Sequence, residues 1–124
     1  MTAVLDTNAL MMPVECNVRV FEELDRVIGE TDLVVPEAVV AELDRLSDGG
    51  GEEATAASVG RDLVERCRVV DHDATNADDA VLELARELEA YAVTNDGPLR
   101  QALLAADVPV IGLRGRNKLA ITQP

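Results

Sequence analysis

The chain has 124 residues, enough for one hydrophobic core and too few for two, so we expect a single domain over residues 1–124 with a basic C-terminal tail at 115–124. Acidic residues number 24 against 11 basic ones, and the formal net charge of -13 disfavours nonspecific binding to nucleic acid. A nucleic-acid substrate is not excluded, because a single lysine and two aromatic residues resemble the composition of halophilic proteins. In molar salt the Debye length falls to about 3 Å, so an acidic surface repels a polyanion only at short range.

The sequence disfavours a membrane protein and a disulfide-bonded protein. No run of eighteen apolar residues and no charged-then-apolar leader is present, so we expect a cytoplasmic protein without a membrane segment. Cys16 and Cys67 are isolated and lack CxxC spacing, which predicts two reduced thiols rather than a disulfide or a zinc site.

The first half of the chain predicts two strands and three helices. Apolar residues three and four apart indicate the first helix, which Gly29 ends. Pro36 can open the next helix, because its missing N–H would be unpaired there anyway. Residues 47–51, with three glycines, predict a flexible loop before the third helix. In chain order, the elements are a strand at 3–5, a helix at 18–28, a strand at 33–35, a helix from 36 to about 46 and a helix at 53–67.

The second half continues the alternation of strands and helices. The elements are a strand at 68–70, a helix at 77–90, a strand at 91–93, a helix at 98–106 and a strand at 108–113. Pro109 inside the last strand predicts either an edge position or the start of a strand, because proline cannot donate to the ladder. Strands that alternate with helices predict an α/β fold with a parallel sheet covered on both faces.

Several acidic residues are placed where solvated side chains are unusual. Asp6 and Asp96 each follow a predicted strand, and the carboxyl ends of parallel strands meet at one edge of the sheet. On the predicted helices, Glu42 and Asp78 lie in phase with the apolar residues of the core face. Asp79 is one residue off that line, so it ranks second to Asp78.

Each of these acids alone has an ordinary explanation as a helix cap, a first-turn acid, a turn former or a boundary residue. Four such acids, each placed at a strand end or on the core face of a helix, indicate a shared site instead. Carboxylates without basic partners resist ionisation unless a cation neutralises them. Mg²⁺ and Mn²⁺ prefer such oxygen ligands and assist phosphoryl chemistry, so the sequence predicts a site for one of these ions.

Five stretches resemble the PIN-domain nucleases, in the order in which that family carries them: VLDTNAL, VVPEAVVAELDRL, ADDAVLELA, TNDGPLR and VPVIGLRGRNKL. The resemblance covers nearly the whole chain and is strongest to small archaeal single-domain members, which are similar to VapC-type toxins and to PIN nucleases that process ribosomal RNA. It implies a three-layer α/β/α PIN-like fold with a central parallel sheet of about five strands. It also implies an Mg²⁺- or Mn²⁺-dependent endoribonuclease that leaves a 5′-phosphate and a 3′-hydroxyl.

The resemblance carries site roles onto matching positions of this chain. The expected catalytic residues are Asp6, Glu42, Asp78 and Asp96, and the expected metal ligands are Asp6, Asp78, Asp96 and, as the alternative acid of ADDA, Asp79. Hydrogen-bonding support is expected from Thr7, Asn8, Thr94 and Asn95. Candidates for contacts with RNA phosphates are Arg100 near the site and Arg114, Arg116 and Lys118 in the tail.

Other functions compete with this interpretation. A receiver-like, phosphoryl-accepting domain also gathers acids at this edge, but it needs a lysine on a late strand, and Lys118 follows the final one. A PIN domain that binds RNA or an assembly partner without cleaving is the stronger alternative. His72, between Asp71 and Asp73, is expected to be a solvated loop residue rather than a catalytic base. RNA is the expected substrate, with an antitoxin or ribosome-assembly partner and a homodimer as further expectations.

Overall fold

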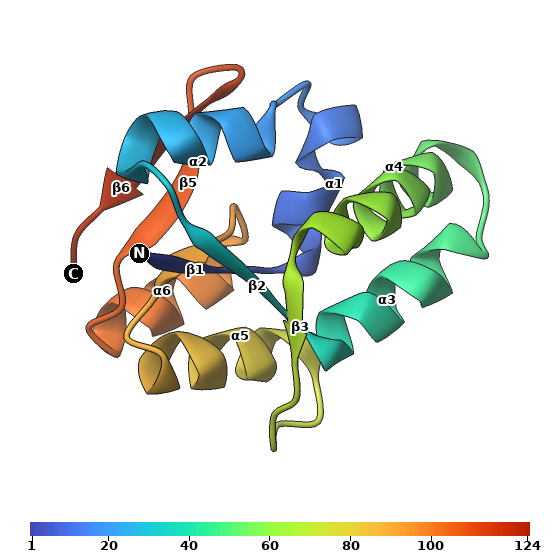
Figure 1. Cartoon of the computed structure of the whole chain (residues 1–124). Helices are drawn as coiled ribbons and strands as arrows, with labels where there is room; N and C mark the ends of the chain where they lie inside the picture. The colour runs from blue at the N-terminus through green and yellow to red at the C-terminus, as the bar shows by residue number, and fades with distance from the viewer.

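The computed structural model describes the whole chain, residues 1–124, as one sheet between two helical layers (Figure 1). The six strands are ordered β3-β2-β1-β4-β5-β6. The strands are β1 (Thr2–Leu5), β2 (Asp32–Pro36), β3 (Arg68–Val70), β4 (Tyr91–Val93), β5 (Val110–Arg114) and β6 (Lys118–Thr122). The helices are α1 (Thr7–Glu15), α2 (Val20–Ile28), α3 (Glu37–Ser47), α4 (Gly51–Leu63), α5 (Ala77–Glu87) and α6 (Gly97–Ala105), and a short 3₁₀ turn, η1 (Val64–Arg66), follows α4. The expected three-layer α/β/α architecture is confirmed.

The parallel core of the sheet places the candidate site. The central strand β1 pairs in parallel with β2 on one side and β4 on the other, with Leu5 opposite Val93. Its residues from Ala3 to Leu5 are fully buried, which explains their unbroken apolar run. Because Leu5 and Val93 are in register, the residues that follow them, Asp6 and Thr94, leave the sheet side by side.

The C-terminal segment differs from the expectation. Residues 115–124 were expected to be a basic tail, but 118–122 form β6, antiparallel to β5. The sheet therefore has five parallel strands, as expected, and a sixth antiparallel one. Pro109 precedes β5, which agrees with its interpretation as the start of a strand. The edge interpretation was wrong, because β6 covers the outer side of β5.

Helix α1 was absent from the prediction. Most of its residues are buried, so its sequence lacks the alternation of polar and apolar faces by which an amphipathic helix is recognised. It packs closely on α4 through small side chains. A Cβ added at Gly60 would lie 2.8 Å from the backbone oxygen of Leu10, so only glycine allows this approach. None of the helices is long and apolar enough to cross a membrane.

Glu23 on α2 anchors β6 through its buried carboxylate. Its carboxylate accepts hydrogen bonds from the Arg26 side chain, at 2.8 and 3.2 Å, and from the backbone N–H of Leu119 at 2.9 Å. These hydrogen bonds, with Arg26 contributing most, lower the pKa of Glu23 to about 2. The glutamate therefore attaches the C-terminal strand to α2.

Replacing Glu23 with Gln is expected to lower the free energy of unfolding by about 1–3 kcal/mol at pH 7, because the three hydrogen bonds to its carboxylate lose the negative charge of the acceptor. The pKa of Glu23 is lower in the folded state than its ordinary value. The carboxylate therefore stabilises the folded state above about pH 4.5, and this stabilisation is lost as the pH falls toward 2. Urea denaturation checks this against Glu22→Gln, an exposed neighbour on the same helix. Equal loss in both variants would contradict the anchoring role.

Candidate active site

Asp6 directly follows β1 and is buried, with 3% of the residue exposed. One carboxylate oxygen accepts a hydrogen bond of 2.7 Å from the backbone N–H of Ala9 and so caps α1. The other oxygen accepts a short hydrogen bond from the Thr94 hydroxyl. Both oxygens are thereby oriented by the two segments that leave the carboxyl edge of the sheet.

The segment Thr94–Asp96 links β4 to α6 and surrounds Asp6. The Thr94 hydroxyl also accepts a hydrogen bond of 3.0 Å from the backbone N–H of Asp96. Asp96 caps α6 by accepting from the N–H of Leu99 at 2.9 Å. The backbone N–H of Asn95 donates to the side-chain oxygen of Asn8 at 3.1 Å. The polar residues between β4 and α6 are thus held in fixed positions around the buried carboxylate.

Thr7 completes the polar surroundings of Asp6 in a different way. Its hydroxyl oxygen is buried and has no hydrogen-bond partner in the protein. A buried hydroxyl without a partner is costly, so it fits a place where a water or an ion supplies the missing contact.

An acidic pocket of about 410 Å³ opens in front of Asp6. It brings together acids from four separate parts of the chain, namely the end of β1, α3, α5 and the start of α6. Two further acids, Glu15 from α1 and Glu53 from α4, also line it, and the sequence did not single them out. Its lining comprises Asp6, Thr7, Asn8, Met11, Glu15, Glu42, Arg45, Leu46, Glu53, Asp78 and Asp96.

The two acids of ADDA face different surroundings. Asp78 lines the acidic pocket. Asp79 lies outside it, where its carboxylate accepts a hydrogen bond of 2.8 Å from the Asn76 side chain. Asn76 in turn caps α5 by accepting from the N–H of Asp79 at 2.9 Å. The helical phase that ranked Asp78 first agrees with this placement.

Mutual repulsion and burial shape the ionisation of the pocket. Burial raises the pKa of Asp6 to about 7, and the negative charges of Asp78 and Asp96 add to the rise, while hydrogen bonds from Thr94 and Ala9 oppose it. The pKa of Asp78 is also raised, first by desolvation and then by Asp96, Glu42 and Asp79. The negative charges of neighbouring carboxylates therefore contribute to the raised pKa of both Asp6 and Asp78.

Basic side chains compensate little of this charge. Arg45 lies 3.7 Å from Glu42, a long contact between two exposed side chains. No ion pair involves Asp6, Asp78 or Asp96. Uncompensated carboxylates in one pocket fit a divalent cation as the missing counter-charge.

The pocket suits a metal ion in its chemistry more than in its present geometry. No group of three or more His, Cys, Asp or Glu side chains is placed to hold one metal ion. The oxygen-only donors, the unpartnered Thr7 hydroxyl and the raised pKa of Asp6 nevertheless fit a hard divalent cation. Each carboxylate keeps lone pairs beyond those used by the helix N–H groups and Thr94.

The four basic candidates for RNA contact are divided by the structure. Arg100 and Arg114 line a second cleft, of about 280 Å³, next to the acidic pocket. Lys118 lies 3.8 Å from the carboxylate of Glu23 and is thus engaged with α2. Arg116 is exposed in the turn between β5 and β6 and lines neither cleft.

His72 has a structural contact that the sequence did not indicate. Its Nε2 accepts a hydrogen bond of 3.0 Å from the backbone N–H of Ala38 in the first turn of α3. Its Nδ1 lies 2.9 Å from the carbonyl oxygen of Ala74. His72 lies in a loop, as expected, but its ring is half-buried and hydrogen-bonded rather than fully solvated. The ring joins the loop before α5 to the start of α3, and it does not line the acidic pocket.

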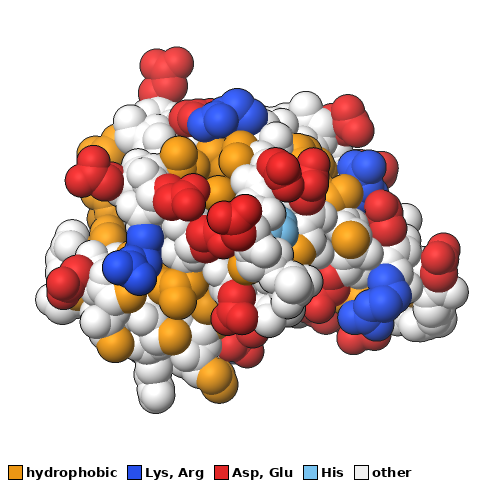
Figure 2. Space-filling view, turned by 90° about the horizontal axis from the view of Figure 1, so that it is seen from below, with side chains coloured by type: hydrophobic (Ala, Val, Ile, Leu, Met, Phe, Trp, Pro, Cys, Tyr) orange, Lys and Arg blue, Asp and Glu red, His pale blue; other side chains and the backbone are white.

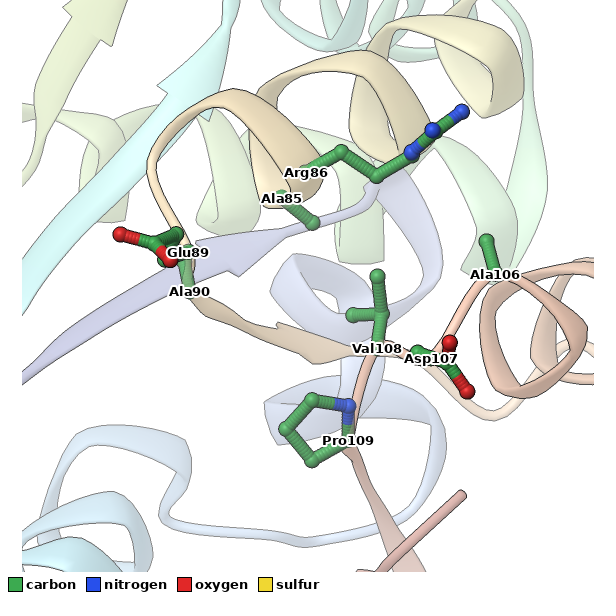
Figure 3. Close-up of a pocket in the computed structure, with 8 residues that line it drawn as sticks. All are labelled: Ala85, Arg86, Glu89, Ala90, Ala106, Asp107, Val108 and Pro109. Carbon is green, nitrogen blue, oxygen red and sulfur yellow. The ribbon is translucent and has the colours of Figure 1, made fainter.

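Another hollow, of about 270 Å³, lies at the opposite edge of the sheet, where β4 and β5 begin (Figure 3). Its two acids, Glu89 and Asp107, follow the ends of α5 and α6 and have left-handed φ angles of 50° and 63°. The N–H groups of Ala90 and Val108 close those helix ends on earlier carbonyl groups. Helix-end geometry accounts for this hollow, so we assign it no ligand.

Comparisons with known proteins agree with this fold. Residues 3–116 match the family described as PIN like domain. Ribonuclease VapC4 of Methanocaldococcus jannaschii is 29% identical over 121 residues, which cover 94% of this chain and 92% of that protein. The structure of the PIN domain endonuclease Utp24 superposes with a TM-score of 0.80 at 23% identity, over 99% of this chain and 92% of the other. The structure of VapBC2 from Rickettsia felis, bound to a DNA fragment from its promoter, superposes with a TM-score of 0.61 at 16% identity. The match covers 82% of this chain and 92% of the other.

Proposed function

The chain belongs to the PIN-like domain family, and from this premise we propose that it is a metal-dependent ribonuclease that hydrolyses RNA phosphodiester bonds at the acidic pocket. One observation carries the proposal. Asp6, Glu42, Asp78 and Asp96 come from four separate elements and line a single pocket. Only Glu42 has an ion-pair partner there, the distant Arg45.

These residues would act together on the scissile phosphate. Asp6, Asp78 and Asp96, with Glu42 directly or through water, would hold Mg²⁺ or Mn²⁺. Bound there, such an ion supplies positive charge to the phosphate and lowers the pKa of the attacking water. Thr94 would keep Asp6 oriented through its hydroxyl. Attack by water on phosphorus, with departure of the 3′ oxygen, leaves a 5′-phosphate and a 3′-hydroxyl.

The buried and the exposed acids would have different roles in this proposal. Asp6, whose pKa is raised to about 7 without metal, would lose its proton when a cation binds. Asp78 lies in the first turn of α5, and Asp96 is the N-cap of α6. The site would thus pass from partly protonated to fully charged as it takes up the metal.

RNA is the partner that this proposal requires. Several structural neighbours are complexes, among them VapBC2 and FitAB, each solved with a DNA fragment. An antitoxin-like protein is proposed as a further partner on this likeness, and a ribosome-assembly factor and a homodimer are proposed beside it. A toxin role and an RNA-processing role would share the same cleavage chemistry.

The test is a matched pair of neutral substitutions in neighbouring residues. Asp78→Asn is expected to lower the Mn²⁺-dependent cleavage rate of single-stranded RNA by about 10²-fold or more, because it removes a proposed metal ligand. Asp79→Asn should stay within about threefold of wild type, because Asp79 lies outside the pocket beside Asn76. Gel analysis of labelled RNA with Mn²⁺ and with EDTA provides the rates.

Two outcomes would contradict the proposal. If Asp79→Asn abolishes cleavage and Asp78→Asn does not, the ligand assignment is wrong. If wild-type protein binds RNA but cuts none with Mg²⁺ or Mn²⁺, the protein is the noncatalytic, RNA-binding form of the fold.

A further inference from the structure

We propose that the cleft between Arg100 and Arg114 binds a phosphate of the RNA strand adjacent to the phosphate that is cleaved. This inference rests on the function proposed above. The cleft has a volume of about 280 Å³ and lies between the start of α6 and the β5–β6 hairpin. Its lining comprises Asn95, Gly97, Arg100, Gly112, Leu113, Arg114, Ala120 and Thr122.

The charge of this cleft is opposite to that of the molecule. Its lining holds two arginines and no acidic residue, in a chain with 24 acidic residues and a net charge of -13. Figure 2 shows one face of the molecule, over which acidic side chains are widely spread and basic ones are few. The acidic pocket and the hollow of Figure 3 both contain carboxylates. A polyanion that approaches this protein therefore meets favourable charge in this cleft.

Both arginines are free to bind an anion. Arg26 and Arg68 each contact a carboxylate at 2.8 Å, which occupies their guanidinium groups. Arg100 and Arg114 take part in no ion pair. Arg100 instead donates a hydrogen bond of 2.9 Å to the Thr122 hydroxyl, which orients its side chain and leaves its other donors free. A guanidinium held in this way can bind phosphate through two parallel hydrogen bonds.

The cleft and the acidic pocket are neighbours along the chain. Asn95 and Gly97 line the cleft, and Asp96 between them lines the acidic pocket. The two hollows therefore adjoin at the segment 95–97. Successive phosphates of one strand can occupy them together, which would fix the register of the strand over the acids.

The close approach at the back of the cleft depends on glycine. A Cβ added at Gly112 would lie 3.0 Å from the backbone oxygen of Thr94, a residue that also orients Asp6. The floor of the cleft is thus packed directly against the segment that supports the acidic pocket. This packing ties the position of the arginines to the position of the carboxylates.

The test measures RNA binding in EDTA, by the anisotropy of a labelled, unstructured single-stranded RNA, so that cleavage does not interfere. Arg100→Gln and Arg114→Gln are each expected to weaken binding by about threefold to tenfold. Each should also reduce the slope of log K against log salt by about 0.7, the value for one phosphate contact on a single strand. Arg100→Lys should restore the slope while regaining only part of the affinity, because lysine keeps the charge without the paired hydrogen bonds.

Arg86→Gln is the matched control, since Arg86 is exposed on α5 and has no ion-pair partner. Its binding curve should match that of wild type within about twofold. If all three glutamine variants weaken RNA binding equally, the effect comes from net charge alone and the subsite is overturned. Unchanged binding in Arg100→Gln and Arg114→Gln would overturn it as well. The subsite stands if wild-type protein binds RNA through these arginines but never cuts it, and then only the nuclease proposal fails.

Discussion

Replacing Asp6 with Asn is expected to lower the rate of metal-dependent RNA cleavage by at least about 10³-fold, or about 4 kcal/mol at the barrier. Asp6 lies at the centre of the site, where its carboxylate contacts both the start of α1 and Thr94. Asparagine keeps the size of the side chain but cannot supply the negative charge that a divalent cation requires. Single-turnover cleavage of labelled RNA with saturating Mn²⁺ gives the rate directly.

The Asp6→Asn protein should remain folded, which separates a lost site from a lost structure. Asparagine is as good a helix N-cap as aspartate, so the hydrogen bond from the N–H of Ala9 can persist. Asp25→Asn serves as the control, because Asp25 is an exposed acid on α2. Cleavage by Asp6→Asn at the wild-type rate would remove Asp6 from the mechanism.

The metal-free protein is expected to lose stability as the pH rises from about 4 to about 7, through Asp6. Its pKa is about 7 in the folded state and 3.8 ordinarily, so between these values the folded state holds a proton that the unfolded state has released. The unfolded state is favoured as the pH increases through this window. At 1.36 kcal/mol for each pH unit, the full effect approaches about 4 kcal/mol.

Comparison with Asp6→Asn isolates this contribution from those of other carboxylates. The two proteins should unfold at similar urea concentrations near pH 4, and the variant should be the more stable by a few kcal/mol at pH 8 in EDTA. Mn²⁺ at about 100 times its dissociation constant should raise the free energy of unfolding of the wild type by about 2.7 kcal/mol. The variant should gain little stability from the ion. Parallel stability curves for the two proteins between pH 4 and 8 would show that Asp6 is ionised in the folded state without metal.

The sequence was most informative where the chain is buried and regular. The apolar run before Asp6 predicted a strand, and its register with β4 in the structure places Asp6 beside Thr94. Helical phase separated Asp78 from Asp79, because α5 is amphipathic and the acid in phase with its apolar stripe, Asp78, is the one that lines the acidic pocket. Strand ends and helix phase together were enough to bring four distant acids to one pocket.

Parts that depend on tertiary contacts were not predictable in the same way. α1 is buried along most of its length, so no polar face marked it as a helix, and Glu15 on its last turn was missed with it. β6 depends on the contact between Glu23 and Leu119, which are 96 residues apart in the chain. Local sequence shows Glu23 only as one acid among several on an amphipathic helix.

The basic residues illustrate the same limit. Lys118 and Arg114 are four residues apart in sequence, yet β6 turns Lys118 toward Glu23 while Arg114 lines the cleft beside the acids. Their roles differ because of the hairpin, and the hairpin was taken for a tail. The sequence therefore indicated which basic residues were candidates for binding. Only the fold shows which of them line the cleft and which support the structure.

Direct binding of Mn²⁺, followed by electron paramagnetic resonance of the free ion, tests the central claim that acids from separate elements share a divalent cation. Wild-type protein is expected to take up Mn²⁺ saturably near pH 7.5, and both Asp6→Asn and Asp96→Asn should lose most of this uptake. Unchanged uptake in the two variants, or none in the wild type, would contradict the account.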